Sequence, residues 1–509
     1  MRRRALGLVL VVLAACTSGK SASPSSSASG PTTTTRPQYT PVYVDSQCNS
    51  EVPSSPRIQC GTLTVPEDRS KPDGRKVVLP VAVVHSADAH PAPDPVIYFS
   101  GGPGYPGLTD AEGFLTKGQT GNRDVILFDQ RGTGLAQPSL DCPEVHEATA
   151  TILGAANSFE VEGKTLNDAL LACRDRLRAT GVDFSQYNTS ATADDVADLR
   201  TAMGIKEWNL FGVSYGTTVA LVTMRAHPEG VRSVTIDSVL PTDEGGTAPA
   251  TVDSFDRVKR VFFAGCAADT KCHAAYPNLE ADTNALVQQL DVSPYHGTIM
   301  NPVLHRQTPI TITGADADAG LFNAFYDTGL IPTLPSLIEA LKASPSGAII
   351  DQLAISGIDF VNGAAEAETA AVDCADRGAL LHDDDTARSI AAHPEDATVL
   401  LFSAVSCADF GVAPAPQGFN DPVRSDIPTL VLGDEYDPVT PPEQSARVRD
   451  ALALDVREVP RPRSRRRVRS ARVPRTHLPG VPRRSGREGR HVVRRVHGPA
   501  GMGGTGLVA

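Results

Sequence analysis

Five short hydrophobic runs divide the chain, and each has the length of a buried β-strand. Helical periodicity separates several of them, as in residues 192–203, where Thr192 and Asp195 are expected to cap the helix start. Strands that alternate with helices predict a mostly parallel sheet covered on both faces, and therefore an α/β protein. The expected strands are residues 96–99, 125–128, 208–213, 234–236 and 429–432.

Residues 41–90 and 241–425 depart from this alternation. The first segment alternates apolar and polar positions, which predicts antiparallel strands leading into the sheet. The second is far longer than a crossover between two strands requires. We expect it to form a largely helical lid over the mouth of the sheet, inserted between core segments 41–240 and 426–460; a separate domain is the alternative. Its helix-like stretches are residues 253–264, 279–290, 334–343 and 366–371.

The strand at 208–213 runs directly into the sequence Gly212-Val213-Ser214-Tyr215-Gly216, and helix-compatible residues follow. A sharp turn from strand to helix forces its central residue into strained backbone space and needs flanking glycines. Such a turn lifts a hydroxyl clear of the sheet, where it can attack a carbonyl. Ser214 is therefore the candidate nucleophile, and a serine in an ordinary turn is the alternative.

Two glycine-containing loops follow other expected strands. Ser100-Gly101-Gly102-Pro103-Gly104 can bring backbone N–H groups close to an oxyanion, so we expect one donor from Gly102 or its neighbour. The second donor should be the amide of Tyr215, the residue after the nucleophile. The loop at 129–134 (Asp-Gln-Arg-Gly-Thr-Gly) is expected to brace the site by hydrogen bonds rather than to take part in catalysis.

The segment after the last expected strand carries three acids, Asp434, Glu435 and Asp437. A Ser-His-acid triad needs a carboxylate that orients the histidine and stabilises its imidazolium form. Asp437 is the candidate because Pro438 holds it in a tight turn, and the other two acids are interpreted as solvated loop charges.

The N-terminus has the pattern of an export signal. Three arginines precede eleven apolar residues, too few to span a bilayer, and Leu13-Ala14-Ala15-Cys16 resembles a bacterial lipobox. We therefore expect residues 1–16 to be a lipoprotein signal peptide, with Cys16 lipidated and anchored to the membrane. A plain secretory cleavage site is the alternative. Residues 17–40, rich in Ser, Thr and Pro, predict a flexible tether.

Export makes the remaining cysteines candidates for disulfides. Eight follow Cys16, and sequence order suggests local pairs such as Cys48–Cys60 and Cys266–Cys272. No close cysteine–histidine spacing indicates a metal, so neither metal nor cofactor is expected. Residues 461–509 hold 14 Arg against one Glu, so the rest of the chain carries a net charge of −25. An acidic body argues against a nucleic-acid partner.

The elbow at 212–216, the Gly101-Gly102-Pro103-Gly104 loop, the Asp-Gln-Arg-Gly loop and Asp437-Pro438-Val439-Thr440-Pro441 occur together here. This combination resembles the secreted bacterial tripeptidyl aminopeptidases, serine peptidases of the α/β-hydrolase fold related to proline iminopeptidases. The resemblance covers residues 40–460. It implies Ser214 as nucleophile, Asp437 as acid, an oxyanion site at Gly102, and a lid that binds the free N-terminus of a peptide.

The histidine that should follow Asp437, in a Gly-x-Gly-His context, is absent from this reading frame. One permitted coding of residues 461–468, CGG CCT CGG TCA CGG CGT CGT G, reads Gly-Leu-Gly-His-Gly-Val-Val once its first base is dropped. The histidine then falls across the codons of Ser464 and Arg465. We therefore predict that residues 461–509 are out of frame, through a reading error or a real lesion; a basic tail for anionic surfaces is the alternative. The 509-residue chain should be nearly inactive and, without its last helix, poorly soluble.

The sequence thus predicts an exported serine exopeptidase that removes short peptides, tripeptides by resemblance, from the N-terminus of peptide substrates. Carboxylates in the lid, among them Asp373 and Asp376, are candidates to hold the substrate ammonium group. An esterase or lipase of the same fold is one alternative. A non-catalytic surface lipoprotein that binds peptides is the other.

Overall fold

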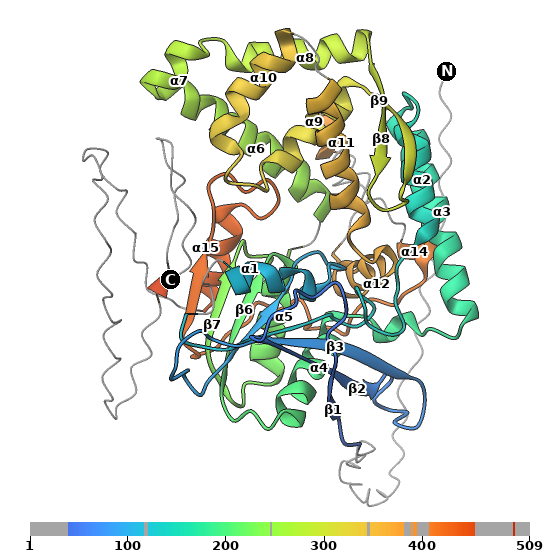
Figure 1. The fold of residues 1–509 in the computed structure, drawn as a ribbon, viewed down its shortest axis with the longest axis vertical. Helices are drawn as coiled ribbons and strands as arrows, with labels where there is room; N and C mark the ends of the chain where they lie inside the picture. The colour runs from blue at the N-terminus through green and yellow to red at the C-terminus, as the bar shows by residue number, and fades with distance from the viewer. Residues whose placement is uncertain are drawn as a thin grey trace, which may run out of the picture.

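The structure, a computed structural model, describes residues 39–452 except 117–120, 245–246, 344–346, 381–387, 390 and 394–406, together with the pair 492–493. A nine-stranded sheet with the order β1-β2-β3-β5-β4-β6-β7-β10-β11 forms the core (Figure 1). Strands β1, β2, β3 and β5 pair antiparallel, and β5, β4, β6, β7, β10 and β11 pair parallel. Their bounds are β1 Val42–Ser46, β2 Ile58–Pro66, β3 Lys76–Val84, β4 Val96–Phe99, β5 Val125–Phe128, β6 Trp208–Val213, β7 Val231–Asp237, β10 Thr429–Leu432 and β11 Val492–Val493.

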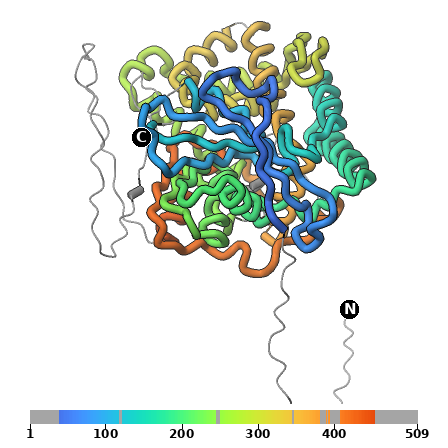
Figure 2. The backbone as a smooth tube through the Cα atoms, turned by 60° about the horizontal axis from the view of Figure 1, so that its bottom comes forward, coloured from blue at the N-terminus to red at the C-terminus, as the bar shows by residue number. Residues whose placement is uncertain are grey.

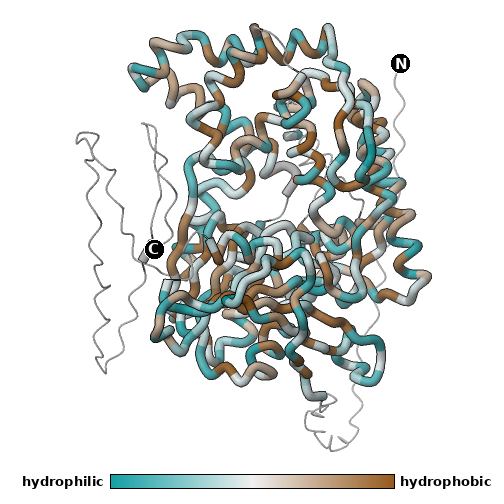
Figure 3. Tube along the Cα trace, in the orientation of Figure 1, coloured by the Kyte–Doolittle hydropathy of each residue, from teal (hydrophilic) through white to brown (hydrophobic). Residues whose placement is uncertain are grey.

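All five strands predicted from hydrophobic runs are present, and the alternating segment near the N-terminus forms the antiparallel strands. The runs are continuous because the central strands are buried on both faces; every residue of β5 is buried. Hydrophobic residues accordingly concentrate along the central strands in Figure 3. The fold class is the predicted one.

Helices α1 (Ala111–Thr116), α4 (Thr189–Ala202), α5 (Tyr215–Ala226) and α15 (Pro442–Ala451) belong to the core. The predicted cap of α4 was wrong. The helix begins at Thr189, and the Asn188 side chain caps it by accepting from the amide of Ala191 at 2.9 Å. Asp195 is buried instead, and the side chains of Arg69 and Arg131 both donate hydrogen bonds to its carboxylate.

Most of the inserted segment, from α6 (Thr247–Ala268) to α11 (Gly347–Asn362), gathers at one end of the molecule, coloured yellow-green to light orange in Figures 1 and 2. Its later helices, α12 (Glu366–Arg377) and α14 (Cys407–Phe410), lie beside the sheet. The four predicted helices are present, accompanied by a two-stranded antiparallel sheet, β8–β9, that periodicity did not predict. Between α6 and α11 lie α7 Thr270–Ala275, α8 Leu279–Val292, β8 Tyr295–Asn301, β9 Arg306–Ile312, α9 Gly314–Ala324 and α10 Leu334–Ala343.

Helices α2 (Pro143–Leu153) and α3 (Phe159–Ala179) precede this segment in sequence but contact it in space (Figure 1). Helix α2 contacts β9 and α11, and α3 contacts α12 and α14. Side chains from α2, α3 and α12 share one hydrophobic cluster. The α2–α3 hairpin, which the sequence placed with the core, therefore supports the flank of the lid.

Four disulfides join Cys48–Cys60, Cys142–Cys173, Cys266–Cys272 and Cys374–Cys407, so both suggested local pairs are confirmed. Within the described ranges, no helix is both long and apolar enough to cross a bilayer.

The described residues do not include the expected signal peptide with Cys16 or nearly all of the tether. They also leave out the position near Ser464 where the histidine is expected. Of the arginine-rich tail, only Val492–Val493 is described. This pair forms β11, which the sequence did not predict, beside β10.

Candidate active site

Ser214 occupies the turn between β6 and α5 with φ 55° and ψ −125°, a strained conformation for a residue with a side chain. Its flanking glycines are required by space. A Cβ on Gly212 would lie 2.3 Å from the carbonyl oxygen of Gly216, and a Cβ on Gly216 would lie 2.1 Å from that of Phe99. The predicted elbow is therefore confirmed as a backbone geometry.

The glycine loop after β4 lies against this elbow. A Cβ on Gly101 would lie 3.1 Å from the Cβ of Ser214 and 3.5 Å from its Oγ. The next residue, Gly102, has φ 111°, which favours glycine. Tyr215 opens α5, so its amide belongs to the positive end of the helix dipole. Gly101 and Ser214 make this contact, and the two expected oxyanion donors, Gly102 and Tyr215, are the residues that directly follow them.

Asp437 lies in the loop after β10, and its carboxylate is held by its own loop. Oδ1 accepts from the amides of Val439 at 2.9 Å and Thr440 at 2.7 Å, and Oδ2 accepts from the Thr440 hydroxyl at 2.6 Å. These bonds fix the orientation of the carboxylate. Asp434 instead accepts from the amide of Tyr436, two residues on.

A fourth carboxylate, Asp237 at the end of β7, was missed by the sequence analysis. Its carbonyl accepts from the amide of Ser214 at 3.0 Å, and its backbone pairs with Leu432 of β10. Burial, followed by the charges of Asp437 and Asp434, raises the pKa of Asp237 to about 6. Asp237 ends β7, which pairs with the strand that leads to Ser214. An acid at the carboxyl end of an expected strand was the sequence signal from which it could have been predicted.

The lid binds both loops of the site. The carbonyl of Gly104 accepts from the amide of Ala365 at 3.0 Å, and the carbonyl of Pro103 accepts from the Thr369 hydroxyl at 2.8 Å. On the other side, Arg257 of α6 donates to the carbonyls of Glu435 at 3.0 Å and Asp437 at 2.9 Å. The lid position is thereby coupled to the glycine loop and to the acid loop.

Arg131 confirms the predicted bracing role of the loop at 129–134. Its side chain is fully buried and donates to both carboxylate oxygens of Asp195, at 2.8 and 2.7 Å. It also donates to the carbonyls of Glu67 and Gln186. Arg69 donates to the same aspartate at 2.6 Å. These bonds tie the loop after β5 to α4 and to the chain on either side.

Helix α12 carries four acids. Burial, followed by the charges of two of them, Asp376 and Glu368, raises the pKa of Tyr215 in the elbow. Thr189 connects two of the buried groups, because its hydroxyl hydrogen-bonds to Tyr215 at 2.8 Å and to the carboxylate of Asp376. Asp376 and Glu368 are almost fully buried, and burial raises the pKa of both carboxyls, that of Asp376 to about 6. The Asp373 side chain is 25% exposed and accepts from Arg377 at 2.8 Å. Of these three acids, Asp373 has the most exposed side chain, and burial raises the pKa of its carboxyl as well.

No hydrogen bond or ion pair joins a histidine to Ser214 or Asp437 among the residues that the structure describes. The nucleophile, the glycine loop and the acid loop therefore come together at one edge of the sheet, while the expected general base stays outside the described residues. The geometry is that of a nucleophile elbow in an α/β-hydrolase.

Comparison with known proteins agrees with this class. Residues 94–281 match the family described as alpha/beta hydrolase fold, and residues 396–457 match the one described as TAP-like protein. The chain therefore has the α/β-hydrolase fold, and its residues 396–457 are similar to the TAP-like proteins.

Individual relatives cover different parts of the chain. The tripeptidyl aminopeptidase of Streptomyces lividans is 30% identical over 194 residues, 36% of this chain and 35% of that protein. The chain thus spans about a third of the length of this relative. The serine protease Hip1 of Mycobacterium tuberculosis (strain H37Rv) is 24% identical over 75% of this chain and 76% of its own. A crystal structure of proline iminopeptidase from Mycobacterium smegmatis aligns at 16% identity and a TM-score of 0.35, covering 77% of this chain and 87% of that one.

Proposed function

We propose that this fold is built for an exported serine exopeptidase that releases short peptides, tripeptides among them, from the N-terminus of peptide substrates. The strained backbone of Ser214 between two space-limited glycines carries the proposal, because it supports a nucleophile that projects from the sheet. Relatives named tripeptidyl aminopeptidase and serine protease support the peptidase reading.

In the proposed mechanism Ser214 attacks the scissile carbonyl, and the amides of Gly102 and Tyr215 donate to the resulting oxyanion. A histidine takes the serine proton and passes it to the leaving amine, while Asp437 orients that histidine. The hydrogen bonds from Val439 and Thr440 hold Asp437 ready for this role. No step calls for a cofactor.

The general base must come from the restored reading frame near Ser464. Without it, a triad enzyme loses several orders of magnitude in rate, so the 509-residue chain should be close to inactive. Resequencing the genomic DNA across codons 450–509 tests this directly. An intact frame encoding Gly-x-Gly-His would mean that the present tail is a reading error and that the protein is an active peptidase, whereas a genuine one-base lesion would mean that the gene encodes a disabled relative.

Asp373 is the proposed anchor for the substrate ammonium group. It lies one helical turn beyond Thr369, which touches the glycine loop, and it is the acid of its cluster that solvent reaches. Glu368 and Asp376 are buried behind it, and burial raises the pKa of both carboxyls, whereas Asp373 accepts from Arg377 at 2.8 Å. We therefore choose Asp373, the most exposed of the three, to pair with an incoming ammonium group.

Two measurements test the activity. A phosphonate probe for serine hydrolases should label the frame-restored chain and not its S214A variant. The frame-restored enzyme should also cleave tripeptide amides with a free N-terminus and reject the same amides when the N-terminus is acylated. Equal cleavage of free and blocked substrates would favour the esterase alternative, and folded protein without labelling would favour a peptide-binding lipoprotein.

The D373N variant tests the anchor. It should raise KM for substrates with a free N-terminus by about tenfold or more, while probe labelling of Ser214 persists. The matched control is D282N, which removes another aspartate of the lid that pairs with a cation, Lys342. An unchanged KM in D373N would exclude Asp373 as the anchor.

Export and a lipid anchor at Cys16 remain predictions from the sequence. Metabolic labelling of expressing bacteria with a clickable fatty acid should mark the wild-type protein and not C16S. Labelling of neither, with secretion of both, would indicate a plain secretory signal.

A further inference from the structure

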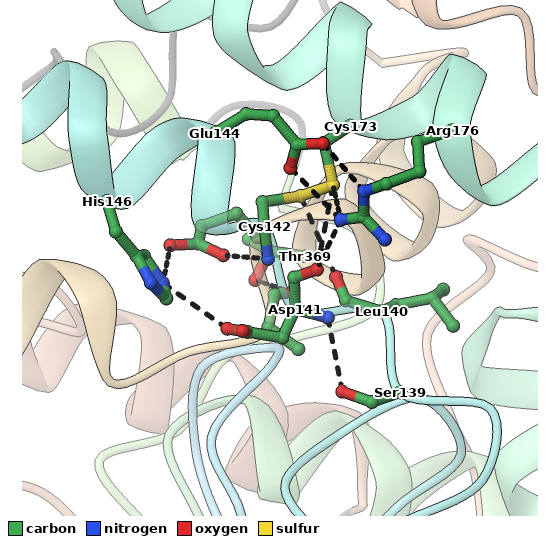
Figure 4. The surroundings of a disulfide bond; sticks show 11 residues. Ser139, Leu140, Asp141, Cys142, Glu144, His146, Cys173, Arg176 and Thr369 are labelled. Atoms are coloured by element: carbon green, nitrogen blue, oxygen red, sulfur yellow. Dashed lines mark hydrogen bonds and ion pairs between the residues drawn. A yellow bond between two sulfur atoms is a disulfide. The ribbon is translucent and has the colours of Figure 1, made fainter. Parts of the chain in front are cut away.

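A histidine and two carboxylates from distant parts of the chain converge on one flank of the lid. Nε2 of His146 lies 3.1 Å from Oε1 of Glu366 and 3.3 Å from Oδ1 of Asp141. All three ligand atoms lie within 4.8 Å of one another. Figure 4 shows the His146 ring facing the Asp141 carboxylate beside the Cys142–Cys173 disulfide.

The nitrogen in this cluster lacks a directional hydrogen bond. Nε2 of His146 is buried and makes none that meets hydrogen-bond geometry, although two carboxylate oxygens are near it, and the side chain is only 8% exposed. Oε1 of Glu366 is in the same position. Neither carboxylate therefore satisfies the ring nitrogen in hydrogen-bond geometry, and imidazole nitrogens are common metal ligands.

The spacing also fits a shared cation. Zn²⁺ binds nitrogen and oxygen ligands at about 2.0–2.2 Å in tetrahedral geometry, which places adjacent ligand atoms about 3.3–3.5 Å apart. The observed 3.1 and 3.3 Å are close to this separation. Two carboxylates and one neutral imidazole leave a charge of −2, which a divalent ion balances. Ca²⁺ and Mg²⁺ fit less well because they prefer oxygen ligands alone.

The surroundings hold the ligands in place and leave a route for the ion. Oε2 of Glu366 accepts from the amide of Cys142 at 3.1 Å, which directs Oε1 toward His146. The Arg176 side chain donates hydrogen bonds to the Glu144 carboxylate and to the carbonyl oxygen of Asp141, and none of its hydrogen bonds within the described residues reaches the Asp141 carboxylate. The Asp141 side chain is 45% exposed, which opens one side of the cluster to water and a fourth ligand.

From this geometry we propose that Asp141, His146 and Glu366 form a Zn²⁺ site that joins the α2–α3 hairpin to the first turn of α12. No metal was expected from the sequence because the proposed ligands are not close together along the chain. Glu366 lies 224 positions beyond Cys142, the residue next to Asp141. The ion is structural: α12 also carries Thr369, which holds the glycine loop, so the site fixes the flank of the lid near the active site.

Zinc binding by the purified chain, without a histidine tag, tests the site. Protein stripped with a chelator and titrated with ZnCl₂ in a calorimeter, for both the 509-residue and the frame-restored chains, should bind one Zn²⁺ per chain. H146Q should weaken this binding by at least about 100-fold. D141N, at the exposed ligand, should weaken it by about tenfold or more and serves if H146Q does not fold.

The matched control is H227Q, because His227 pairs with a single carboxylate, Asp194, at 2.8 Å. It should leave zinc stoichiometry and affinity unchanged. Substitution by Co²⁺ should give a visible d–d absorption band in the wild type and H227Q, and none in H146Q. Absence of saturable one-site binding in folded protein, or equal binding by H146Q, would overturn the proposal and leave His146 as a protonated ion-pair partner. Neither readout depends on peptidase activity.

Discussion

Replacing Gly216 by alanine should displace the nucleophile elbow and destabilise the protein. The new Cβ would lie 2.1 Å from the carbonyl oxygen of Phe99 and 2.8 Å from that of Ser100, whereas real Cβ atoms essentially never come within 3.0 Å. Both partners are backbone atoms, and Phe99 is fixed by pairing with Gly212. No change of rotamer can relieve this contact, so α5 must move by about 1 Å away from β4.

The magnitude follows from comparison with a second glycine. Gly113 lies in α1, and a Cβ there would meet nothing within 4 Å. Alanine is favoured over glycine inside a helix by about 0.5–1 kcal/mol, a gain that G113A and G216A share. Overpacking of a rigid site costs about 1–3 kcal/mol, and we expect the upper end because two backbone carbonyls are involved. G216A should therefore be less stable than G113A by about 3 kcal/mol.

Urea unfolding followed by circular dichroism measures this difference in the frame-restored chain. The 509-residue chain can be added if, contrary to our expectation of poor solubility, it unfolds cooperatively. G216A should also lose labelling of Ser214 by a phosphonate probe, while G113A keeps it. A G216A protein as stable as G113A and labelled at the same rate would refute the claim that the helix is locked against β4.

Three further changes probe other parts of the structure. The raised pKa of Asp237, about 6, means that the folded state holds this proton more tightly than the unfolded chain, so its stabilising contribution is full below about pH 4 and is lost as the pH rises through 6. The stability of wild type relative to D237N should therefore fall between pH 4 and 7 by no more than about 3 kcal/mol, and a difference independent of pH would contradict this. R131M should lower the free energy of unfolding by about 3–5 kcal/mol because it removes a buried partner of Asp195. In urea unfolding, the double variant R131M/D195N should lose less stability than the two single variants added together, and simple additivity would argue against the pair. Removing the Cys374–Cys407 bridge with C374A/C407A should lower the free energy of unfolding by about 4 kcal/mol from its sequence separation of 33, and a loss below about 1 kcal/mol would show that α12 and α14 are held by other contacts.

The locally encoded features could be predicted from the sequence. The five strands follow from hydrophobic runs, and the elbow at Ser214 follows from glycines placed between a strand and a helix. The turn at Asp437 follows in the same way from its proline and the amides after it. In each case a few neighbouring residues determine the backbone, so the pattern is visible without the rest of the fold.

Contacts between distant segments were decided only by the tertiary structure. Asp195 was expected to cap a helix, but it is buried against Arg131, 64 positions away, because the fold places the loop after β5 against α4. Asp237 meets the acid loop because β7 pairs with β10 across the whole inserted segment. Periodicity carries no information on which segments become neighbours, since that choice depends on how the lid, the hairpin and the sheet exclude water together. The convergence of His146 with Glu366 has the same origin: each residue is unremarkable in its own stretch of chain, and the packing of α2 against the lid creates the cluster.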